Sequence, residues 1–223
     1  MAYVDSNQGV YNLGFDSRLS SRTNQLVAYS VLRDNGLTFE DKGVPPLSRE
    51  GTPHDDDGDA GDPVLAVDQG SEIVYLAGTS PRNAAGHKGI PLWKSTDGGV
   101  TFGAPIAVRD DIVHSDKPWI AVDNATGTGQ HDVYLTCSTI QSPLGLWLTV
   151  STNGNGANWS APVPIRQTDG INVTGVQSAI VVIGPDHVAY VVWFERTADG
   201  INWLKMRRIA ARRLGRSIRS ASL

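Results

Sequence analysis

The sequence predicts an all-β protein, a β-propeller built from repeated four-stranded antiparallel sheets. Two sets of landmarks support this prediction, because both recur at nearly the same interval along the 223 residues. The first is a polar, glycine-containing turn that ends in an aromatic residue. The second is a pair of apolar segments joined by a short turn, with a tyrosine in the second segment. Repetition of one strand-rich unit at a fixed interval is typical of propeller blades.

The turns share an Asp or Asn, one or two glycines and a closing aromatic residue. The aromatic residues Phe39, Phe102 and Trp159 are 63 and 57 residues apart. This composition suits a tight turn between two strands, because Gly, Asn and Asp tolerate positive φ. The copies are RDNGLTF (33–39), STDGGVTF (95–102), STNGNGANW (151–159) and, more weakly, TADGINW (197–203).

The paired apolar segments keep the same interval. Their tyrosines Tyr75, Tyr134 and Tyr190 are 59 and 56 residues apart. Two independent landmarks with one period predict four short strands per repeat, since each segment has the β-branched and aromatic content of a strand. In the middle repeat the strands are expected at about 118–122, 132–137, 146–150 and 159–165.

The acids of the turns are interpreted as structural. Asp97 is expected to accept hydrogen bonds from its own turn, Gly99 to adopt positive φ, and Phe102 to fill the space beneath. Short Asp and Asn side chains commonly bond to nearby backbone, which argues against a catalytic role. The same roles fall to Asp34, Gly36 and Phe39 in the first copy, and to Asn153 and Trp159 in the third.

The pattern S-x-D-x-G-x-T-F resembles the Asp-box, or bacterial neuraminidase (BNR) repeat, of sialidase-like propellers. It occurs here together with DPVLAVD and DKPWIAVD, each followed by a VYL strand. The resemblance covers about residues 25–203 and implies a six-bladed propeller, of which this chain holds about three to four blades. We therefore expect residues 1–204 to be a partial propeller. Residues 205–223 contain one lysine, six arginines and no acid, and are expected to be a basic tail outside it.

The resemblance implies a ligand site at the strand ends opposite the Asp-boxes. A sialidase-type glycoside hydrolase, acting on terminal sialic acid or a related glycan, uses an acid/base carboxylate, and Asp62 and Asp116 are the candidates. They are assigned to equivalent positions of successive first strands. Glu195 is the candidate partner of a tyrosine nucleophile. The substrate-binding candidates are Arg49, Arg82, Lys117 and Gln177.

Two observations leave other functions open. The arginine motif F/Y-R-I-P of the family is absent, and no tyrosine of this chain can be assigned as the nucleophile. Each candidate is also consistent with an ordinary loop charge or strand-end cap. The alternatives are a non-catalytic propeller that binds a glycan or a protein, and an inactive fragment.

The segment HDDDGDAGD (54–62) is the densest acidic cluster. Carboxylates with interleaved glycines suit a Ca²⁺ loop, but the spacing of Asp55, Asp57 and Asp59 does not match an EF-hand. A solvated acidic loop is the other interpretation. The histidines show no metal-ligand spacing, so no cofactor is predicted apart from this weak calcium candidate.

Composition excludes several classes of function. The net charge is −4 and residues 205–223 carry +7, so the rest of the chain carries −4 − 7 = −11, which argues against a nucleic-acid surface. No apolar run approaches the ~20 residues of a membrane span.

One cysteine, Cys137, allows no disulfide within the chain. No signal peptide is recognised in the first thirty residues, although the resemblance implies an extracellular or cell-surface protein. The open edges of a partial propeller predict self-association.

Overall fold

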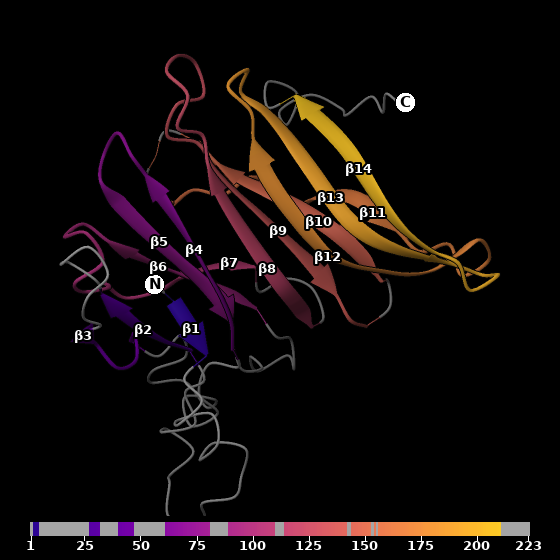
Figure 1. Cartoon of the computed structure of the whole chain (residues 1–223), viewed down its shortest axis with the longest axis horizontal. Coiled ribbons are helices and arrows are strands. Elements are labelled where there is room, and N and C mark those ends of the chain that lie inside the picture. Colours follow the sequence, from indigo (N-terminus) through magenta and orange to yellow (C-terminus); the bar gives the residue numbers. More distant parts are fainter. Residues whose placement is uncertain are drawn as a thin grey trace, which may run out of the picture. The chain divides into compact units, whose positions relative to one another are not determined.

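The structure is a computed structural model in which every described regular element is a β-strand (Figure 1). The described part contains no helix that is long and apolar enough to cross a membrane. The strands form four antiparallel sheets, and the chain divides into two compact units. The structure describes residues 2–4, 27–31, 40–46, 61–80, 89–109, 114–141, 144–152, 154 and 156–210.

The first unit comprises residues 1–67 and 72–116 and holds two sheets. In its four-stranded sheet the strands lie in chain order, β4-β5-β6-β7, as the repeat predicts. The other sheet has the order β1-β2-β3. The strands are β1 (Ala2–Val4), β2 (Val27–Val31), β3 (Glu40–Asp41), β4 (Gly61–Asp68), β5 (Ile73–Thr79), β6 (Ile90–Ser95) and β7 (Ile106–Arg109).

Aromatic side chains fill the core of this unit. The rings of Tyr29 and Phe102 meet edge to face, with centroids 4.9 Å apart, an arrangement that aromatic pairs prefer. The indole of Trp93 is fully buried, and its Nε1 donates to the carbonyl oxygen of Pro46 at 2.7 Å. Leu76 packs in the same cluster. The core therefore joins β2 to the strands β5 and β6.

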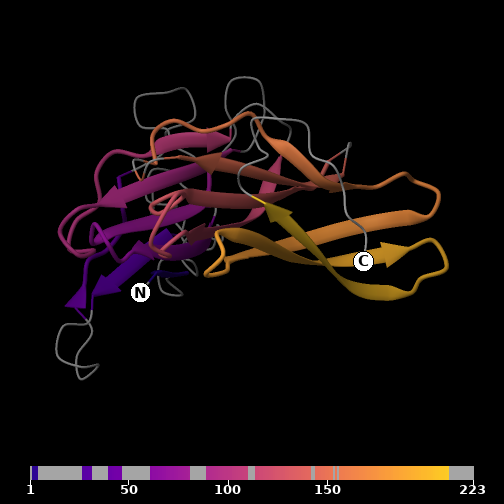
Figure 2. The ribbon, with the colours of Figure 1, turned by 90° about the horizontal axis from the view of Figure 1, so that it is seen from above.

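The second unit comprises residues 117–223 together with the turn Asp68–Ser71. Its sheets have the orders β8-β9-β10-β11 and β12-β13-β14, again in chain order. The orange and yellow strands of its last sheet are seen from above in Figure 2. The four strands predicted for the middle repeat are confirmed, with ends that differ by a few residues. They are β8 (Ser115–Val122), β9 (Val133–Thr139), β10 (Gly145–Ser151) and β11 (Val163–Gln167), followed by β12 (Val173–Ile183), β13 (Val188–Thr197) and β14 (Asn202–Ala210).

The two sheets of the second unit pack through alternate residues of their strands. Val181 and Val191 are fully buried against the sheet β8–β11. The hydroxyl of Thr136 on β9 donates to the carbonyl of Ala179 on β12 at 2.5 Å. The opposite face of the sheet β12–β14 carries large apolar side chains that are exposed. These are Ile180, Val182, Phe194, Leu204 and Met206.

The expected domain boundary after residue 204 falls inside a strand. β14 continues to Ala210 and pairs with β13 along its whole length. Ile209 is buried in the core, whereas Met206 and Arg208 are exposed. The charge run conceals this alternation, and positive charge is common on an edge strand because it discourages further pairing. Residues 211–223 lie outside the described residues.

The TADGINW segment is not a fourth copy of the closing turn. It connects β13 to β14, the second and third strands of their sheet, whereas the turn at 95–102 connects the third strand to the fourth. Thr197 donates to Asp199, and Gly200 has φ 84°. A short hairpin calls for the same turn residues wherever it occurs, which explains the likeness.

Candidate functional site

Each four-stranded sheet has two different ends. The turns from the first to the second strand and from the third to the fourth lie at one end, because successive strands are antiparallel. The turn from the second to the third strand and the connection to the next sheet lie at the other. The predicted ligand residues belong to this second end.

The turn after β6 contains Asp97, whose carboxylate serves its own backbone. Asp97 Oδ1 accepts from the N–H groups of Val100 and Thr101, both at 3.0 Å. Asp97 Oδ2 accepts from the hydroxyl of Thr101 at 2.6 Å. These bonds from Thr101, with one from Ser95, hold the pKa of Asp97 well below its usual range. The carboxylate is therefore engaged in the turn itself.

The residues around this turn complete a local plug. Gly99 has φ 87°, and Phe102 is 8% exposed beneath the turn. In the later copy, Trp159 Nε1 donates to the carbonyl oxygen of Gly156 at 2.8 Å and Trp159 bridges to Ser151. The remaining turn residues of the prediction lie outside the described residues. They are Asp34, Gly36, Phe39 and Asn153.

The first strands of the three later sheets each contain a left-handed residue, which lies near the start of β4 and of β8 and in the middle of β12. Asp62 has φ 52°, Lys117 49° and Ser178 59°. The pairing of β12 with β13 shifts register at this point, as expected of a bulge. These three residues are equivalent, so the expected equivalence of Asp62 with Asp116 is wrong by one residue. Asp116 corresponds instead to Gln177, the residue before Ser178.

The predicted ligand residues differ in exposure. Asp62 and Asp116 are half-buried, and Lys117 and Gln177 are exposed. A half-buried carboxylate at a strand start is accessible to a ligand while its backbone is fixed. The two arginine candidates, Arg49 and Arg82, lie outside the described residues.

Among the predicted catalytic and substrate-binding residues that the structure describes, Glu195 is the most buried, at 5% exposure. It lies near the end of β13, where its Oε2 accepts from Arg166 Nε at 2.9 Å and from Trp193 Nε1 at 3.3 Å. Two N–H donors thus hold one oxygen of the carboxylate. Within the described residues, the hydrogen-bond partners of Glu195 include no tyrosine.

The sequence reasoning missed Arg166. It ends the fourth strand of its sheet and follows Trp159 by seven residues, just as Arg109 follows Phe102. Arg109 is 2% exposed, and the side chain of Arg166 is 37% exposed. Alignment of the repeats on their closing aromatic residues would have found both arginines, because the shared spacing is visible in the sequence.

The solved structures that resemble this chain include an arabinanase and two sialidases. Alpha-L-arabinanase from Penicillium chrysogenum, complexed with arabinobiose, aligns at TM-score 0.57 and 15% identity over 82% of this chain and 54% of that chain. Hadza microbial sialidase Hz136 aligns at TM-score 0.52 and 14% identity, over 70% and 35%. Trypanosoma rangeli sialidase aligns at TM-score 0.51 and 13% identity, over 87% and 32%.

The likeness settles the fold. The chain has the sialidase-like β-propeller fold. It spans between 32% and 54% of the length of these neighbours. Neither the protein-family models nor the curated proteins give a match.

Metal ligands are not assembled in the part of the propeller that the structure describes. No group of three His, Cys, Asp or Glu side chains there could hold a metal ion. The calcium candidates Asp55, Asp57 and Asp59 lie outside the described residues.

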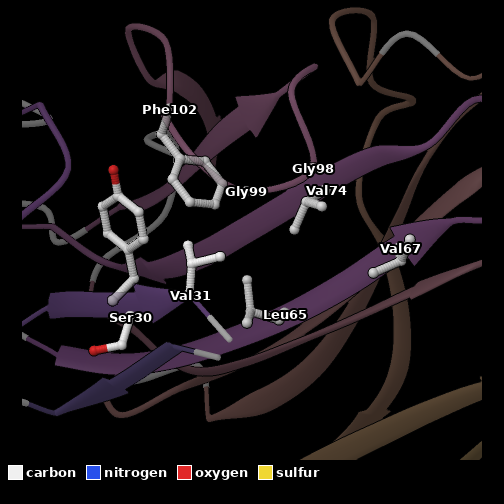
Figure 3. A pocket seen from close by; sticks show the side chains of 9 residues that line it. Ser30, Val31, Leu65, Val67, Val74, Gly98, Gly99 and Phe102 are labelled. Atoms are coloured by element: carbon white, nitrogen blue, oxygen red, sulfur yellow. The ribbon is translucent and has the colours of Figure 1, made fainter. Parts of the chain in front are cut away.

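The propeller also contains an apolar hollow beside the Asp97 turn. It has a volume of about 300 Å³, and the side chains of Val31, Leu65, Val74 and Phe102 line it (Figure 3). No carboxylate, histidine, lysine or arginine is among its lining residues. The phenol of Tyr29 also lines the hollow, and burial raises the pKa of this phenol, which keeps it neutral near neutral pH.

Proposed function

We propose that the chain is part of a glycoside hydrolase of the sialidase-like propeller class. The observation that carries this proposal is the buried carboxylate of Glu195, fixed by Arg166 and Trp193 at the end of β13 that faces away from the Asp-box turns. Two of the solved neighbours, a sialidase and an arabinanase, support the choice of class.

The chemistry requires two carboxyl groups with different roles. Most glycosidases use one as general acid/base and another as nucleophile, while sialidases use a tyrosine nucleophile beside a carboxylate. We assign the acid/base role to Asp116 or Asp62, because each is half-buried at the start of a first strand. Glu195, held by a guanidinium, is positioned to stabilise positive charge or to polarise a hydroxyl.

Substrate binding is assigned to the polar residues at the same strand ends. Lys117 and Gln177 are exposed and can donate hydrogen bonds to sugar hydroxyls or to a carboxylate. Arg49 and Arg82 are proposed to bind the carboxylate of a terminal sialic acid, since a guanidinium pairs with a carboxylate in two parallel hydrogen bonds. The specific reaction that we propose is the removal of a terminal sialic acid, which is exo-sialidase activity.

One observation favours a second function, a propeller that binds a glycan without cleaving it. Glu195 already pairs with Arg166 and with an indole N–H, so its carboxylate also stabilises the packing of β13 against β11. A group with that structural role need not take part in catalysis.

The test is hydrolysis by the purified full chain. The substrates are a fluorogenic α-sialoside, a chromogenic α-L-arabinofuranoside and linear arabinan. We expect turnover of at least one substrate and a loss of kcat of roughly 10²-fold or more in Asp116→Asn or Asp62→Asn, the range of general acid–base catalysis. Glu72→Gln, an exposed carboxylate in the turn after β4, is the matched control and should keep its activity.

The outcomes separate the two functions. Turnover that falls in an Asp variant but not in the control supports the hydrolase. Absence of turnover from chain whose circular dichroism shows a cooperative fold overturns it and favours the binding propeller. Glu195→Gln is tested together with its unfolding curve, so that a loss of fold is distinguished from a loss of chemistry.

A further inference from the structure

Trp203 and Lys205 on β14 lie beside the Glu195–Arg166 pair. In the register of the β13–β14 hairpin, Trp203 is opposite Glu195 and Lys205 is opposite Trp193. Directly opposed residues of antiparallel strands project from the same face. The indole of Trp203 is therefore a neighbour of the carboxylate and of the guanidinium that binds it. The hairpin is the pair of yellow and orange strands β14 and β13 in Figure 1.

The two tryptophans of this face differ in exposure. Trp193 is 7% exposed, whereas Trp203 is 47% exposed. The Nζ atom of Lys205 lies 4.8 Å from the centroid of the Trp203 ring, within the range of a cation–π interaction. An exposed indole beside an ammonium offers an apolar surface and a positive charge to the same ligand.

The charges of this cluster favour an anion. Arg166 uses Nε for Glu195, and its terminal nitrogens make no hydrogen bond within the described residues. Its charge balances that of Glu195, and Lys205 adds one positive charge. Arg207, on the same face of β14, donates through a terminal nitrogen to the carbonyl oxygen of Ile165 at 2.8 Å. The cluster therefore carries net positive charge and has unused donors.

We propose that Trp203, Lys205 and Arg166 form a binding subsite for an anionic saccharide. The apolar face of a sugar ring lies against the indole, and a carboxylate or sulfate of the sugar binds the ammonium and the guanidinium. This inference rests on the proposed carbohydrate function and adds a ligand class to it. The residues of the subsite belong to β11 and β14.

Isothermal titration of the full chain tests the subsite without any need for turnover. The ligands are trigalacturonic acid, its methyl ester and a chondroitin sulfate disaccharide. We expect trigalacturonic acid to bind more tightly than its methyl ester. Trp203→Ala should raise the Kd of the acid by roughly tenfold. Lys205→Met keeps the stem and should reduce the preference for acid over ester, because the guanidinium of Arg166 remains. The sulfated ligand shows whether the site accepts sulfate as well as carboxylate.

Trp119→Ala is the matched control, because Trp119 is 38% exposed on β8, away from the hairpin. Unchanged binding in this variant supports the assignment. Equal affinity for acid and ester, equal affinity in Trp203→Ala and the unmodified chain, or no binding by folded chain would each overturn it. Binding without hydrolysis refutes the proposed enzyme but leaves the subsite. Hydrolysis without this binding refutes the subsite but leaves the proposed enzyme.

Discussion

The Nδ1 atom of His187 lies 2.7 Å from Oδ2 of Asp123. Asp123 follows β8 and His187 precedes β13, so the contact joins the sheet β8–β11 to the sheet β12–β14. The same relationship recurs between His131 and Asp68, at 2.8 Å and 2.9 Å to the two carboxylate oxygens. Both histidines have positive φ, 59° for His187 and 72° for His131, and both carboxylates are buried. A repeated Asp–His contact thus fixes successive first-to-second-strand turns against each other.

Removal of the His187 side chain should destabilise the second unit by about 1–3 kcal/mol, because it leaves the buried carboxylate oxygen of Asp123 without its imidazole partner. His187→Gly is the suitable variant, since glycine tolerates the positive φ of this residue. Urea unfolding followed by circular dichroism measures the loss. In a double-mutant cycle with Asp123→Asn, the two losses should not add.

The matched control for this contact is the exposed pair of Arg208 and Asp186, whose atoms lie 3.2 Å apart. Their side chains are 63% and 46% exposed, so Arg208→Ala should change stability much less than His187→Gly. Equal losses of unfolding free energy in the two variants would show that the buried contact stabilises the fold no more than the exposed one.

Asp68 gives a dependence of stability on acid pH. Burial disfavours its ionised form, but hydrogen bonds from Ser71, His131 and the N–H of Gly70 outweigh burial and lower the pKa of Asp68. A carboxylate with a lowered pKa in the folded state stabilises the fold above its unfolded pKa of about 3.9, and this contribution disappears as the pH falls below that value. Asp68→Asn should flatten this part of the profile. Urea midpoints between about pH 2.5 and pH 6 measure it, and an unchanged slope would refute the assignment.

Asp97→Ala should lower the melting temperature, because three N–H and O–H donors from Val100 and Thr101 lose their acceptor. Asp97→Asn should recover part of the loss, since the amide oxygen still accepts. Asp199→Ala is the comparison, because Asp199 accepts from Thr197 and, at a longer 3.3 Å, from one N–H. A fall as large in Asp199→Ala would contradict the stronger role of Asp97.

Arg166→Ala should reduce stability by about 1.5–3 kcal/mol, because Glu195 then remains buried with only the indole N–H as partner. Arg166→Ala combined with Glu195→Gln should recover part of this loss, since the amide carries no charge. Thermal and urea unfolding of the three variants provide the measurement. A double variant that is less stable than Arg166→Ala would show that the ion pair is not the main contribution of Arg166.

The exposed apolar face of the sheet β12–β14 should cause concentration-dependent self-association. Leu204 is 79% exposed and Met206 is 58% exposed on this face. Replacement of both by lysine should shift the chain towards monomer in sedimentation velocity. A Trp119→Lys variant controls for added charge elsewhere, and self-association that persists in the Leu204/Met206 variant would locate the contact on another surface.

The sequence alone predicted the strands and the repeat, because alternation of apolar residues and turn chemistry are local properties. The strand content around Tyr75, Tyr134 and Tyr190 was sufficient to place β5, β9 and β13. The sequence predicted residues from 205 onward to lie outside the propeller, whereas β14 continues to Ala210. The charge run from Lys205 concealed the alternation that ends in the buried Ile209. The positions of Asp62 and Asp116 were offset by one residue, because DKPWIAVD (116–123) has one residue more than DPVLAVD (62–68) before the shared AVD, and the prediction aligned the acids instead.

Only the tertiary structure decided which charged groups meet. Arg166 and Glu195 are 29 residues apart, and His187 is 64 residues from Asp123. Both histidines stand three residues before a strand tyrosine, a spacing that is visible in the sequence but does not identify a partner. The partner depends on how consecutive sheets pack, and that packing is set by apolar contacts over the whole unit. The sequence by itself therefore determined the repeated sheets, and the packing of those sheets selected the ion pairs and the candidate site.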